Sequence, residues 1–437
     1  MTTIPAPDGP RSLAAPPTEL ALSLAHVLAL VRSRLAVTRP DVARVSGYGR
    51  TVVTERLGQL IGAGLVEEGE KGVIPRGRAP RLLSFLPDAG VILTAEIEAN
   101  ALTVGVTDLD GRILVTRDVP HVLTPDVEVV MAVLDEAFGA ALAEAGVSAQ
   151  KVWGIGLGVP FPVDYATARP IATSGWNAWD GYGLRAHLEQ RFGAPTWADN
   201  DVNLMALGEL RSGVARGVGD FVYVRVGRGV GGGVVSGGRL HRGAQGAAGA
   251  LGHIKVVEGS RIVCRCGSTG CLQTVASGGA LVAEAMALAQ SGQSPYLAHR
   301  LAAKGEVELE DLAAAALEGD AEASAALERS AAYLGTAIAT AVNFHNPALV
   351  LLGGPVVGLS QAYLATVRGT VLRKALPLAT RDLRIEVSPL GDRAGLVGAA
   401  AMVVDELLSP GLLERWIEAG SPRVLAGEGS SALSPEA

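Results

Sequence analysis

The pattern of apolar residues changes once along the chain, near Pro87. Before this point the sequence predicts short helical segments; after it, runs rich in Val, Ile and Leu alternate with glycine-rich turns and helical stretches. Such alternation predicts an α/β fold, in which helices flank a mixed sheet. Because 437 residues exceed a typical single domain, we predict a small domain over residues 18–87 and a large α/β domain over residues 88–410. Residues 1–17 and 411–437 are expected to form a flexible leader and a C-terminal tail.

The large domain is predicted to contain two related α/β halves. In the first half, strands over residues 91–96, 102–108 and 112–117 precede a helix over 126–145 and a strand over 152–158, with a hairpin turn at Asp110-Gly111. A second cycle begins near Phe221. It is predicted to contain strands over residues 221–226, 232–236, 349–352 and 384–389, and helices over 280–289, 309–318, 321–344 and 395–408.

Composition argues against several classes of protein. Aromatic residues make up only 4% of the chain, which argues against the binding of RNA or single strands by base stacking. No apolar run reaches the length of a membrane span, and the N-terminus lacks a basic region followed by an apolar one. We therefore expect no signal peptide, no membrane association and a cytoplasmic location. Residues 1–87 carry a net charge of +4 and the remainder carries −11. This difference fits a first domain that binds nucleic acid, although a charge of +4 could also arise by chance.

The small domain has the pattern of a winged helix-turn-helix. Helices are predicted over residues 20–32, 40–45 and 50–63, with Thr38 as the cap of the second helix and a turn at Ser46-Gly47. Residues 67–85 place a basic loop that contains proline and glycine between two short strands, as in a wing. The alternative is a three-helix protein-interaction module with a solvated basic loop.

Six residues are predicted to contact DNA. The third helix would be the recognition helix, and its early polar side chains would meet base edges in the major groove. The arginines of the wing would contact phosphates or the minor groove. These residues are Arg50, Thr51 and Thr54 in the helix and Arg76, Arg78 and Arg81 in the wing.

All three cysteines lie close together and, with one histidine, form the pattern H-x10-C-x-C-x4-C. The predicted metal ligands are His253, Cys264, Cys266 and Cys271. Four such ligands fill a closed tetrahedral site, so the predicted cofactor is a structural Zn²⁺ rather than a catalytic one. An odd number of cysteines does not form a secreted disulfide framework. The alternative is metal-free thiols, with His253 as an ordinary polar residue.

Several segments of the chain resemble the ROK family (repressor, open reading frame, kinase). The resemblance is carried by GRLHRGAQGAAGALGHI followed by CRCGSTGCLQ, by GLGVPFPVD at residues 156–164, by ADNDVN at 198–203 and by ALVLLGGPV at 348–356. It covers roughly residues 18–410, and the winged helix-turn-helix matches the repressor branch. The resemblance implies that residues 88–410 form a sugar-kinase-like domain with an actin-like, hexokinase-type ATPase fold of two α/β lobes.

The resemblance also implies a sugar site. In kinases of the family, the acidic residue of an Asn-Asp pair acts as general base towards a sugar hydroxyl and the Asn holds the sugar; these map to Asp201 and Asn200. Asp201 could equally be a loop or helix-capping residue. Together with His253 and Gln273, these two residues make up the predicted ligand-binding set.

The chain departs from the family kinases in both of its phosphate loops. In place of Asp-x-Gly-x-Thr it has Glu96-Ile97-Glu98-Ala99-Asn100, and the carboxylate of Glu98 adds bulk and negative charge where a phosphate would approach. We expect ATP binding and kinase activity to be lost, with Asp201 a vestigial base. In the second loop, over residues 227–231, Arg228 replaces the usual Thr. It either binds an anion or fills the empty site, where it could pair with Glu98.

The sugar pocket departs from the family pattern as well. The motif Glu-x-Gly-His is Ala250-Leu251-Gly252-His253 in this chain, and Cys-Leu-Glu is Cys271-Leu272-Gln273. Two carboxylates that would grip sugar hydroxyls are therefore absent, and each lost partner costs about 1–3 kcal/mol in a polar pocket. The pocket would bind a different sugar, a sugar derivative, or nothing.

We therefore predict a transcriptional repressor that senses a sugar or sugar derivative through a non-catalytic kinase-like domain. Its DNA partner would be a double-stranded, palindromic operator bound by a homodimer or homotetramer. Two alternatives remain open. One is a bifunctional sugar kinase with a DNA-binding arm, and the other is a repressor that is ligand-independent or controlled by a protein partner.

Overall fold

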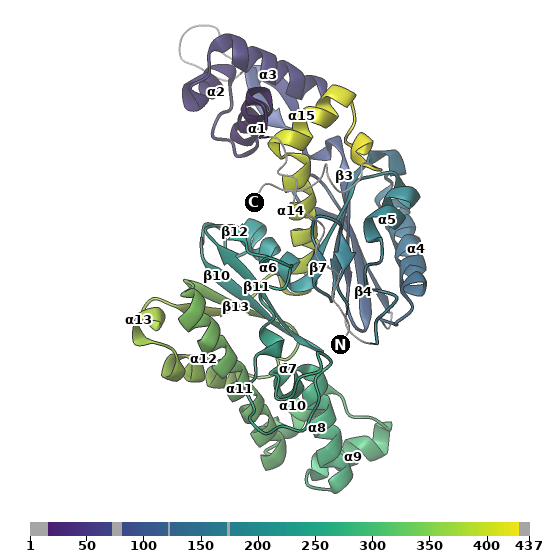
Figure 1. Cartoon of the computed structure of the whole chain (residues 1–437), viewed down its shortest axis with the longest axis vertical. Coiled ribbons are helices and arrows are strands. Elements are labelled where there is room, and N and C mark those ends of the chain that lie inside the picture. Colours follow the sequence, from purple (N-terminus) through teal and green to yellow (C-terminus); the bar gives the residue numbers. More distant parts are fainter. Residues whose placement is uncertain (1–15, 72–80, 121–122, 173–174, 428–437) are drawn as a thin grey trace, which may run out of the picture.

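The computed structural model describes residues 16–71, 81–120, 123–172 and 175–427. Figure 1 shows three parts along the long axis of the molecule: a small winged domain, a first α/β lobe and a second α/β lobe. Each lobe contains a five-stranded sheet with helices packed against it. The two lobes confirm the predicted α/β fold with two related halves.

The winged domain comprises residues 19–85 and contains the three helices and two short strands that the sequence predicts. Its described elements are α1 (Glu19–Arg32), α2 (Arg39–Ser46), α3 (Arg50–Gly62), β1 (Val66–Lys71) and β2 (Arg81–Phe85), and the two strands pair antiparallel. The hydroxyls of Thr18 and Thr38 accept hydrogen bonds from the first backbone N–H groups of α1 and α2, which fixes where these helices begin. Gly47 ends α2 at a φ of +76°, a conformation that favours glycine and permits the tight turn into α3.

The first lobe is built on a sheet with the order β5-β4-β3-β6-β9. The first three of these strands pair antiparallel, whereas β6 runs parallel to both β3 and β9. Helix α4 packs on β4 and β5, and α14 packs on β3 and β6 from the other face (Figure 1). The elements are β3 (Val91–Ile97), β4 (Ala101–Thr107), β5 (Ile113–Pro120), α4 (Val127–Ala145), β6 (Val152–Val159), α5 (Leu184–Phe192), β9 (Thr196–Asn200), α6 (Asp201–Ser212) and α14 (Ala394–Leu407), with the hairpin β7 (Val163–Asp164) and β8 (Arg169–Pro170) and the short turns η1 (Pro87–Ala89) and η2 (Ala149–Lys151).

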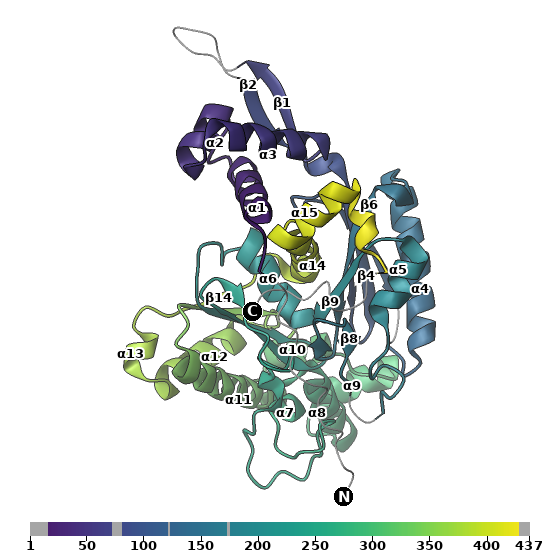
Figure 2. The same cartoon turned by 45° about the horizontal axis from the view of Figure 1, so that its top comes forward.

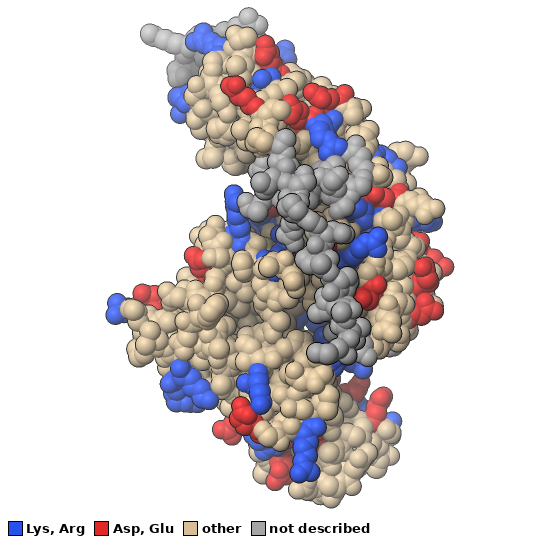
Figure 3. Space-filling view, viewed as in Figure 1, with Lys and Arg blue, Asp and Glu red and all other residues tan. Residues whose placement is uncertain are grey.

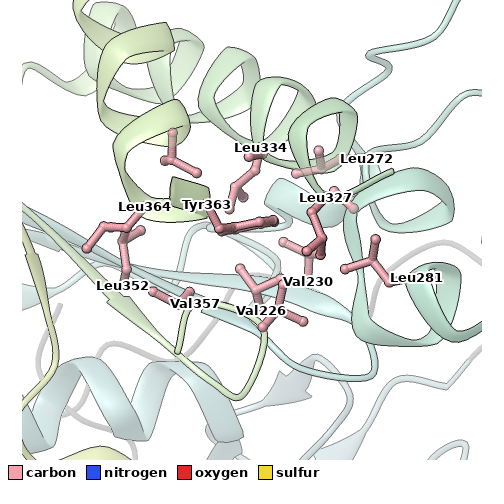
Figure 4. Packing of buried hydrophobic residues seen from close by; sticks show 14 of the residues in the cluster. Val226, Val230, Leu272, Leu281, Leu327, Leu334, Leu352, Val357, Tyr363 and Leu364 are labelled. Atoms are coloured by element: carbon pink, nitrogen blue, oxygen red, sulfur yellow. The ribbon is translucent and has the colours of Figure 1, made fainter. Parts of the chain in front are cut away.

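The second lobe repeats this arrangement, with the strand order β12-β11-β10-β13-β14. Figure 4 shows its core, in which side chains from β10, β11 and β13 meet side chains of α8, α11 and α12. The elements are β10 (Phe221–Val226), β11 (Val230–Ser236), β12 (Arg239–Leu240), η3 (Leu251–His253), α7 (Gln273–Ala276), α8 (Gly278–Ser291), α9 (Pro295–Lys304), α10 (Leu309–Leu317), α11 (Ala321–His345), β13 (Leu349–Gly353), α12 (Gln361–Lys374), α13 (Pro377–Thr380), β14 (Arg384–Val387) and η4 (Gly391–Arg393).

Helices α6 and α14 cross between the two sheets. α14 packs on the sheet of the first lobe, and α6 packs on β10 and β11 of the second. Glycine permits their close approach: a Cβ on Gly398 would lie 1.7 Å from the carbonyl oxygen of Leu204, and a Cβ on Gly208 would lie 2.2 Å from that of Ala394. The position of each lobe is therefore linked to the other through a tight backbone contact.

The C-terminal segment differs from the expectation of a tail over residues 411–437. It forms helix α15 (Pro410–Ala419) and the turn η5 (Pro422–Leu425) before the described residues end. Trp416 is buried, its ring lies 5.4 Å from that of Trp153, and its Nε1–H donates to the carbonyl oxygen of Leu407 at 2.8 Å. The apolar face of this short helix is part of the core. The polar residues around it in the sequence led to the prediction of a tail.

Helix α15 also holds the winged domain to the first lobe, as Figure 2 shows. It packs against α1, and the hydroxyl of Thr18 donates to the carboxylate of Glu414 at 2.9 Å. On a second side, Arg32 at the end of α1 pairs with Asp110 at 3.3 Å and donates to the carbonyl oxygen of Leu109 at 3.2 Å. The winged domain is thus docked on the lobe rather than joined to it by a linker alone.

In the part of the chain that the structure describes, no single helix is long and apolar enough to cross a membrane. One bent pair, Gly391–Leu407 with Pro410–Ala419 at 71°, meets the length and composition criteria only when its two helices are taken together. Both helices have buried faces in the interior described above.

Candidate functional site

Helix α3 presents its predicted DNA-contacting side chains to solvent. Its buried face consists of Val53, Leu57 and Leu60, which pack in the core of the winged domain. The side chains of Arg50, Thr51 and Thr54 lie on the exposed part of the helix. Arg50 and Thr51 lie in the first turn, and Thr54 lies one turn further on, where its hydroxyl donates to the carbonyl oxygen of Arg50 at 2.8 Å. One cation and two hydroxyls near the start of an exposed helix are suited to contacts with base edges and phosphates.

Only one of the predicted wing residues lies in the described part of the chain. Arg81 is exposed at the start of β2, whereas Arg76 and Arg78 lie outside the described residues. Figure 3 shows basic and acidic side chains mixed over the visible face of the winged domain. The fold and the exposed turn of α3, rather than a uniformly basic face, therefore indicate the candidate DNA-binding surface.

The four predicted metal ligands come together in the second lobe. The ligand atoms of His253, Cys264, Cys266 and Cys271 all lie within 4.8 Å of one another. The sulfurs of Cys266 and Cys271 are 3.7 Å apart, and the Cys264 sulfur is 3.6 Å from His253 Nδ1. Zn–S bonds of about 2.3 Å and Zn–N bonds of about 2.0 Å give an S···S edge of about 3.8 Å and an S···N edge of about 3.5 Å in a tetrahedron. The donor set and its dimensions both fit one tetrahedral ion.

Local geometry explains how the loop brings these sulfurs together. The N–H of Cys264 donates to the carbonyl oxygen of Ser268 at 2.8 Å, which closes a tight turn. Gly270 follows at a φ of +77°, and a Cβ there would lie 2.1 Å from the carbonyl oxygen of Val257. Burial raises the pKa of the Cys271 thiol, and a cation held by the four side chains would favour its thiolate form.

The altered first phosphate segment lies at the end of β3 and in the turn to β4. The N–H of Glu98 donates to the carbonyl oxygen of Ala101 at 2.9 Å, and its carboxylate pairs with Arg225 of β10 at 2.5 Å. Asn100 accepts a hydrogen bond from Arg228 at 2.6 Å. The suggested pair between Arg228 and Glu98 is therefore wrong. Arg225, three residues earlier and near the end of β10, pairs with Glu98, and Arg228 donates to the side chain of Asn100 instead.

Arg225 is surrounded by carboxyl groups from the first lobe. Burial lowers its pKa, but Glu98, Asp201 and Glu96 raise it by more, so the guanidinium remains charged. Glu96 is 2% exposed, and burial together with the nearby Glu98 raises its pKa well above the usual value. Its carboxyl lies against the start of α14, where a Cβ on Gly395 would come within 2.0 Å of it. The guanidinium of Arg225 thus lies among these carboxyl groups and balances part of their charge.

Asn200 and Asp201 lie at the start of α6. The side-chain oxygen of Asn200 caps the helix by accepting from the N–H groups of Val202 and Asn203, at 3.1 and 3.4 Å. Asp201 is the first residue of the helix and is only 8% exposed. Burial raises its pKa to about 6, while Arg225 opposes the shift. The helix-capping role left open for Asp201 belongs mainly to Asn200.

The other two predicted ligand-binding residues lie at the candidate metal site. His253 supplies one of the four candidate ligands, and the amide nitrogen of Gln273 donates to the Cys264 sulfur at 2.9 Å. The oxygen of Gln273 faces the phosphate loop, 3.5 Å from where a Cβ on Gly229 would lie. Two cavities, of about 700 Å³ and 470 Å³, open on the described surface, and neither is lined by Asn200, Asp201, His253 or Gln273.

Two arginines of the second lobe that were not among the predicted site residues, Arg225 and Arg242, contact the first lobe. Arg225 carries a sequence signal, because it is a charged residue in the otherwise apolar strand FVYVRV. Arg242 carries none, since it lies in a glycine-rich loop, yet it pairs with the buried Asp199 at 2.7 Å.

Comparison with known proteins agrees with this geometry. A xylose repressor of Caldicellulosiruptor bescii is 28% identical over 384 residues, which cover 88% of this chain and 95% of that protein. A solved ROK family transcriptional regulator, a homologue of the E. coli MLC protein, is 27% identical with a TM-score of 0.77 and covers 91% of this chain and 98% of its own. A ROK family glucokinase from Streptomyces griseus, solved with glucose and AMPPNP, is 30% identical with a TM-score of 0.63 and covers 72% of this chain and 99% of its own.

The regulator therefore matches 91% of this chain. The glucokinase is matched over 99% of its own length, but the match covers only 72% of this chain. The model of the ROK family matches residues 93–406, which include most of both lobes. The expected resemblance is confirmed, and the chain belongs to the ROK family.

Proposed function

We propose that this chain is a DNA-binding transcriptional repressor whose two lobes sense a sugar or sugar derivative without phosphorylating it. The observation that carries the proposal is a winged domain docked on kinase-like lobes in which Glu98 and Arg225 form an ion pair at the phosphate segments. The similarity to the xylose repressor of C. bescii and to the solved regulator supports it.

The phosphate segments support the loss of kinase activity. An incoming polyphosphate would have to displace Glu98 from Arg225 and would meet a carboxylate at the point where close backbone approach is needed. Arg228 is engaged by Asn100 at the same edge. Both arginines are therefore committed to contacts within the chain.

The DNA-binding surface is proposed to be the first turn of α3 with the wing. Arg50, Thr51 and Thr54 would contact base edges, and Arg81, with Arg76 and Arg78, would contact the backbone or minor groove. We further propose that a homodimer or homotetramer binds a palindromic operator, because a symmetric oligomer presents repeated reading helices. Such a regulator would act in the compartment that holds its DNA.

The four ligands of the second lobe are proposed to hold a structural Zn²⁺. With every position of the tetrahedron filled by protein, the ion would supply folding energy and leave no open site for catalysis. It would fix the loop that carries His253 and positions Gln273, through the bond from the Gln273 amide to Cys264. With Asn200 and Asp201, these residues form the proposed effector site.

A sugar kinase with a DNA-binding arm is the second candidate, because one observation favours it. Asp201 is retained at the start of α6, and its pKa of about 6 suits a general base near neutral pH. Turnover of ATP in the presence of a sugar would establish this alternative.

The test begins with DNA that the full chain selects from a random duplex pool. Operator affinity is then measured with D-xylose, D-glucose, phosphosugars, or ATP with magnesium, and phosphate transfer to each sugar is assayed in parallel. The proposal is supported if the chain binds DNA specifically, one carbohydrate changes the operator affinity, and no phosphate is transferred to that carbohydrate. Absence of specific DNA binding, or sugar-dependent ATP turnover, refutes it, and unaltered binding across the panel points to a repressor without a sugar effector.

A further inference from the structure

Arg242 belongs to the second lobe but makes its contacts with the first. It lies in the loop between β12 and η3, which leads to the proposed effector residue His253. Its Nε lies 2.7 Å from a carboxylate oxygen of Asp199 in β9, and its guanidinium lies 3.6 Å from the centre of the Tyr165 ring. One side chain thus makes an ion pair and a cation–π contact across the boundary between the lobes.

The backbone of the same loop also contacts the first lobe. Gly246 has a φ of +70°, and a Cβ there would lie 2.3 Å from the carbonyl oxygen of Val163 in β7. A larger residue would be excluded both by its φ and by this approach. Any rotation of one lobe against the other must therefore carry this loop across β7 or break the contacts of Arg242.

On one side, the contacts of Arg242 reach the proposed effector site. The backbone N–H of Asn200 donates to Asp199 at 2.7 Å, and the side chain of Asn203 donates to the same oxygen at 2.8 Å. Asp199 is 2% exposed and holds Arg242 with its other oxygen. A ligand that moves Asn200 would therefore change the surroundings of Asp199 directly.

On the other side, the contacts reach the helix that supports the winged domain. The hydroxyl of Tyr165 donates to Glu406 at 2.8 Å, in the last turn of α14. The next residue, Leu407, accepts from the indole of Trp416 in α15. Helix α15 packs on α1, and its Glu414 accepts a hydrogen bond from the hydroxyl of Thr18. The end of α14 is therefore linked to the DNA-binding domain through α15.

We infer that Arg242 is a positioning residue that couples the occupancy of the effector site to the DNA-binding domain, through Tyr165 and Glu406. The inference rests on the proposed function above. Its two-state element is the orientation of the lobes, and a ligand shifts that orientation only if it binds one arrangement more tightly than the other. Effector binding would move the loop of Arg242 relative to Asp199 and release or tighten Tyr165 against the end of α14.

The variants are chosen so that Asp199 keeps its partner. Removal of Arg242 would leave a buried carboxylate unpaired, and the chain could fail to fold for that reason alone. Tyr165→Phe keeps the ring against Arg242 and removes only the hydroxyl, and Glu406→Leu removes the oxygen that accepts from that hydroxyl. Asp405→Asn is the matched control, because Asp405 is the neighbouring carboxylate of α14 and pairs with Arg211 of α6 outside this connection.

The experiment measures the affinity of the full chain for its selected DNA with and without D-xylose or D-glucose. Coupling between two sites typically changes affinity about 5- to 150-fold. In Tyr165→Phe and Glu406→Leu we expect DNA affinity without sugar, and sugar affinity by calorimetry, to stay within about 2-fold of the unmodified chain. The effect of the sugar on DNA affinity should fall at least about 5-fold or to none, whereas Asp405→Asn should respond normally. An unchanged response in both variants overturns the inference.

A second measurement keeps the inference separate from the proposed function. If the DNA affinity of the unmodified chain responds to no sugar, the proposed sensing role fails. The coupling inferred for Arg242 is then tested by hydrogen exchange of the ligand-free chain. Faster exchange in α15 and α1 of Tyr165→Phe, but not of Asp405→Asn, supports the coupling. Equal exchange in the unmodified chain and Tyr165→Phe overturns it.

Discussion

Replacing Asp201 by Asn should change how the stability of the chain depends on pH. Burial raises the folded pKa of Asp201 from 3.8 to about 6. Between these values the folded chain keeps a proton that the unfolded chain has released. The stability contributed by protonated Asp201 is therefore complete below about pH 3.8 and is lost as the pH rises through about 6.

The size of the effect follows from the shift. About 2 pKa units correspond to about 3 kcal/mol, of which about 1.4 kcal/mol is lost between about pH 5 and pH 8. The amide of Asp201→Asn does not titrate, so the variant should gain about 1.4 kcal/mol relative to the unmodified chain over this interval. The cysteines and His253 are present in both proteins. Their contribution to the pH dependence of stability therefore cancels when the two proteins are compared at each pH.

The assay is urea unfolding followed by tryptophan fluorescence, for which the chain has 5 Trp. Asp220→Asn is the control of opposite sign, because the N–H of Gly237 and the hydroxyl of Ser236 lower the pKa of Asp220. That variant should lose stability relative to the unmodified chain as the pH rises from about 3 to 5. Parallel pH profiles for Asp201→Asn and the unmodified chain would refute a buried carboxyl at the start of α6.

Three further predictions concern the metal, the C-terminal helix and DNA. Cys266→Ser should lower bound zinc, measured by atomic emission, from about one ion per chain to well below one and lower the melting temperature; equal zinc content would contradict the site. Trp416→Ala should cost about 3–5 kcal/mol in unfolding experiments because the indole is 1% exposed, and a change below about 1 kcal/mol would mean that α15 does not pack as described. Arg50→Ala should weaken operator binding in titrations by about 1–3 kcal/mol while the melting temperature stays unchanged, and equal affinity would exclude this residue from the interface.

The local elements could be predicted because their signals are local. Capping threonines, the Gly47 turn and apolar periodicity predict the three helices of the winged domain to within a residue or two. The grouping of the four candidate metal ligands could also be predicted, since four N and S donors close in sequence have few other uses. By contrast α5, α9, α12 and α15 were not predicted, because the apolar face of each has meaning only against a partner helix or sheet.

The sequence by itself determined the elements of the winged domain, the two α/β halves and the four candidate metal ligands, and its resemblance to the family kinases located the departures at residues 96–100 and 227–231. Only the tertiary structure decided which groups meet across the lobes: Arg225 with Glu98, Arg228 with Asn100, and Arg242 with Asp199 and Tyr165. The physical reason is that an ion pair depends on distance in space. Residues more than 40 positions apart have no fixed separation until the lobes dock, and that docking is set by the close packing of α6 against α14.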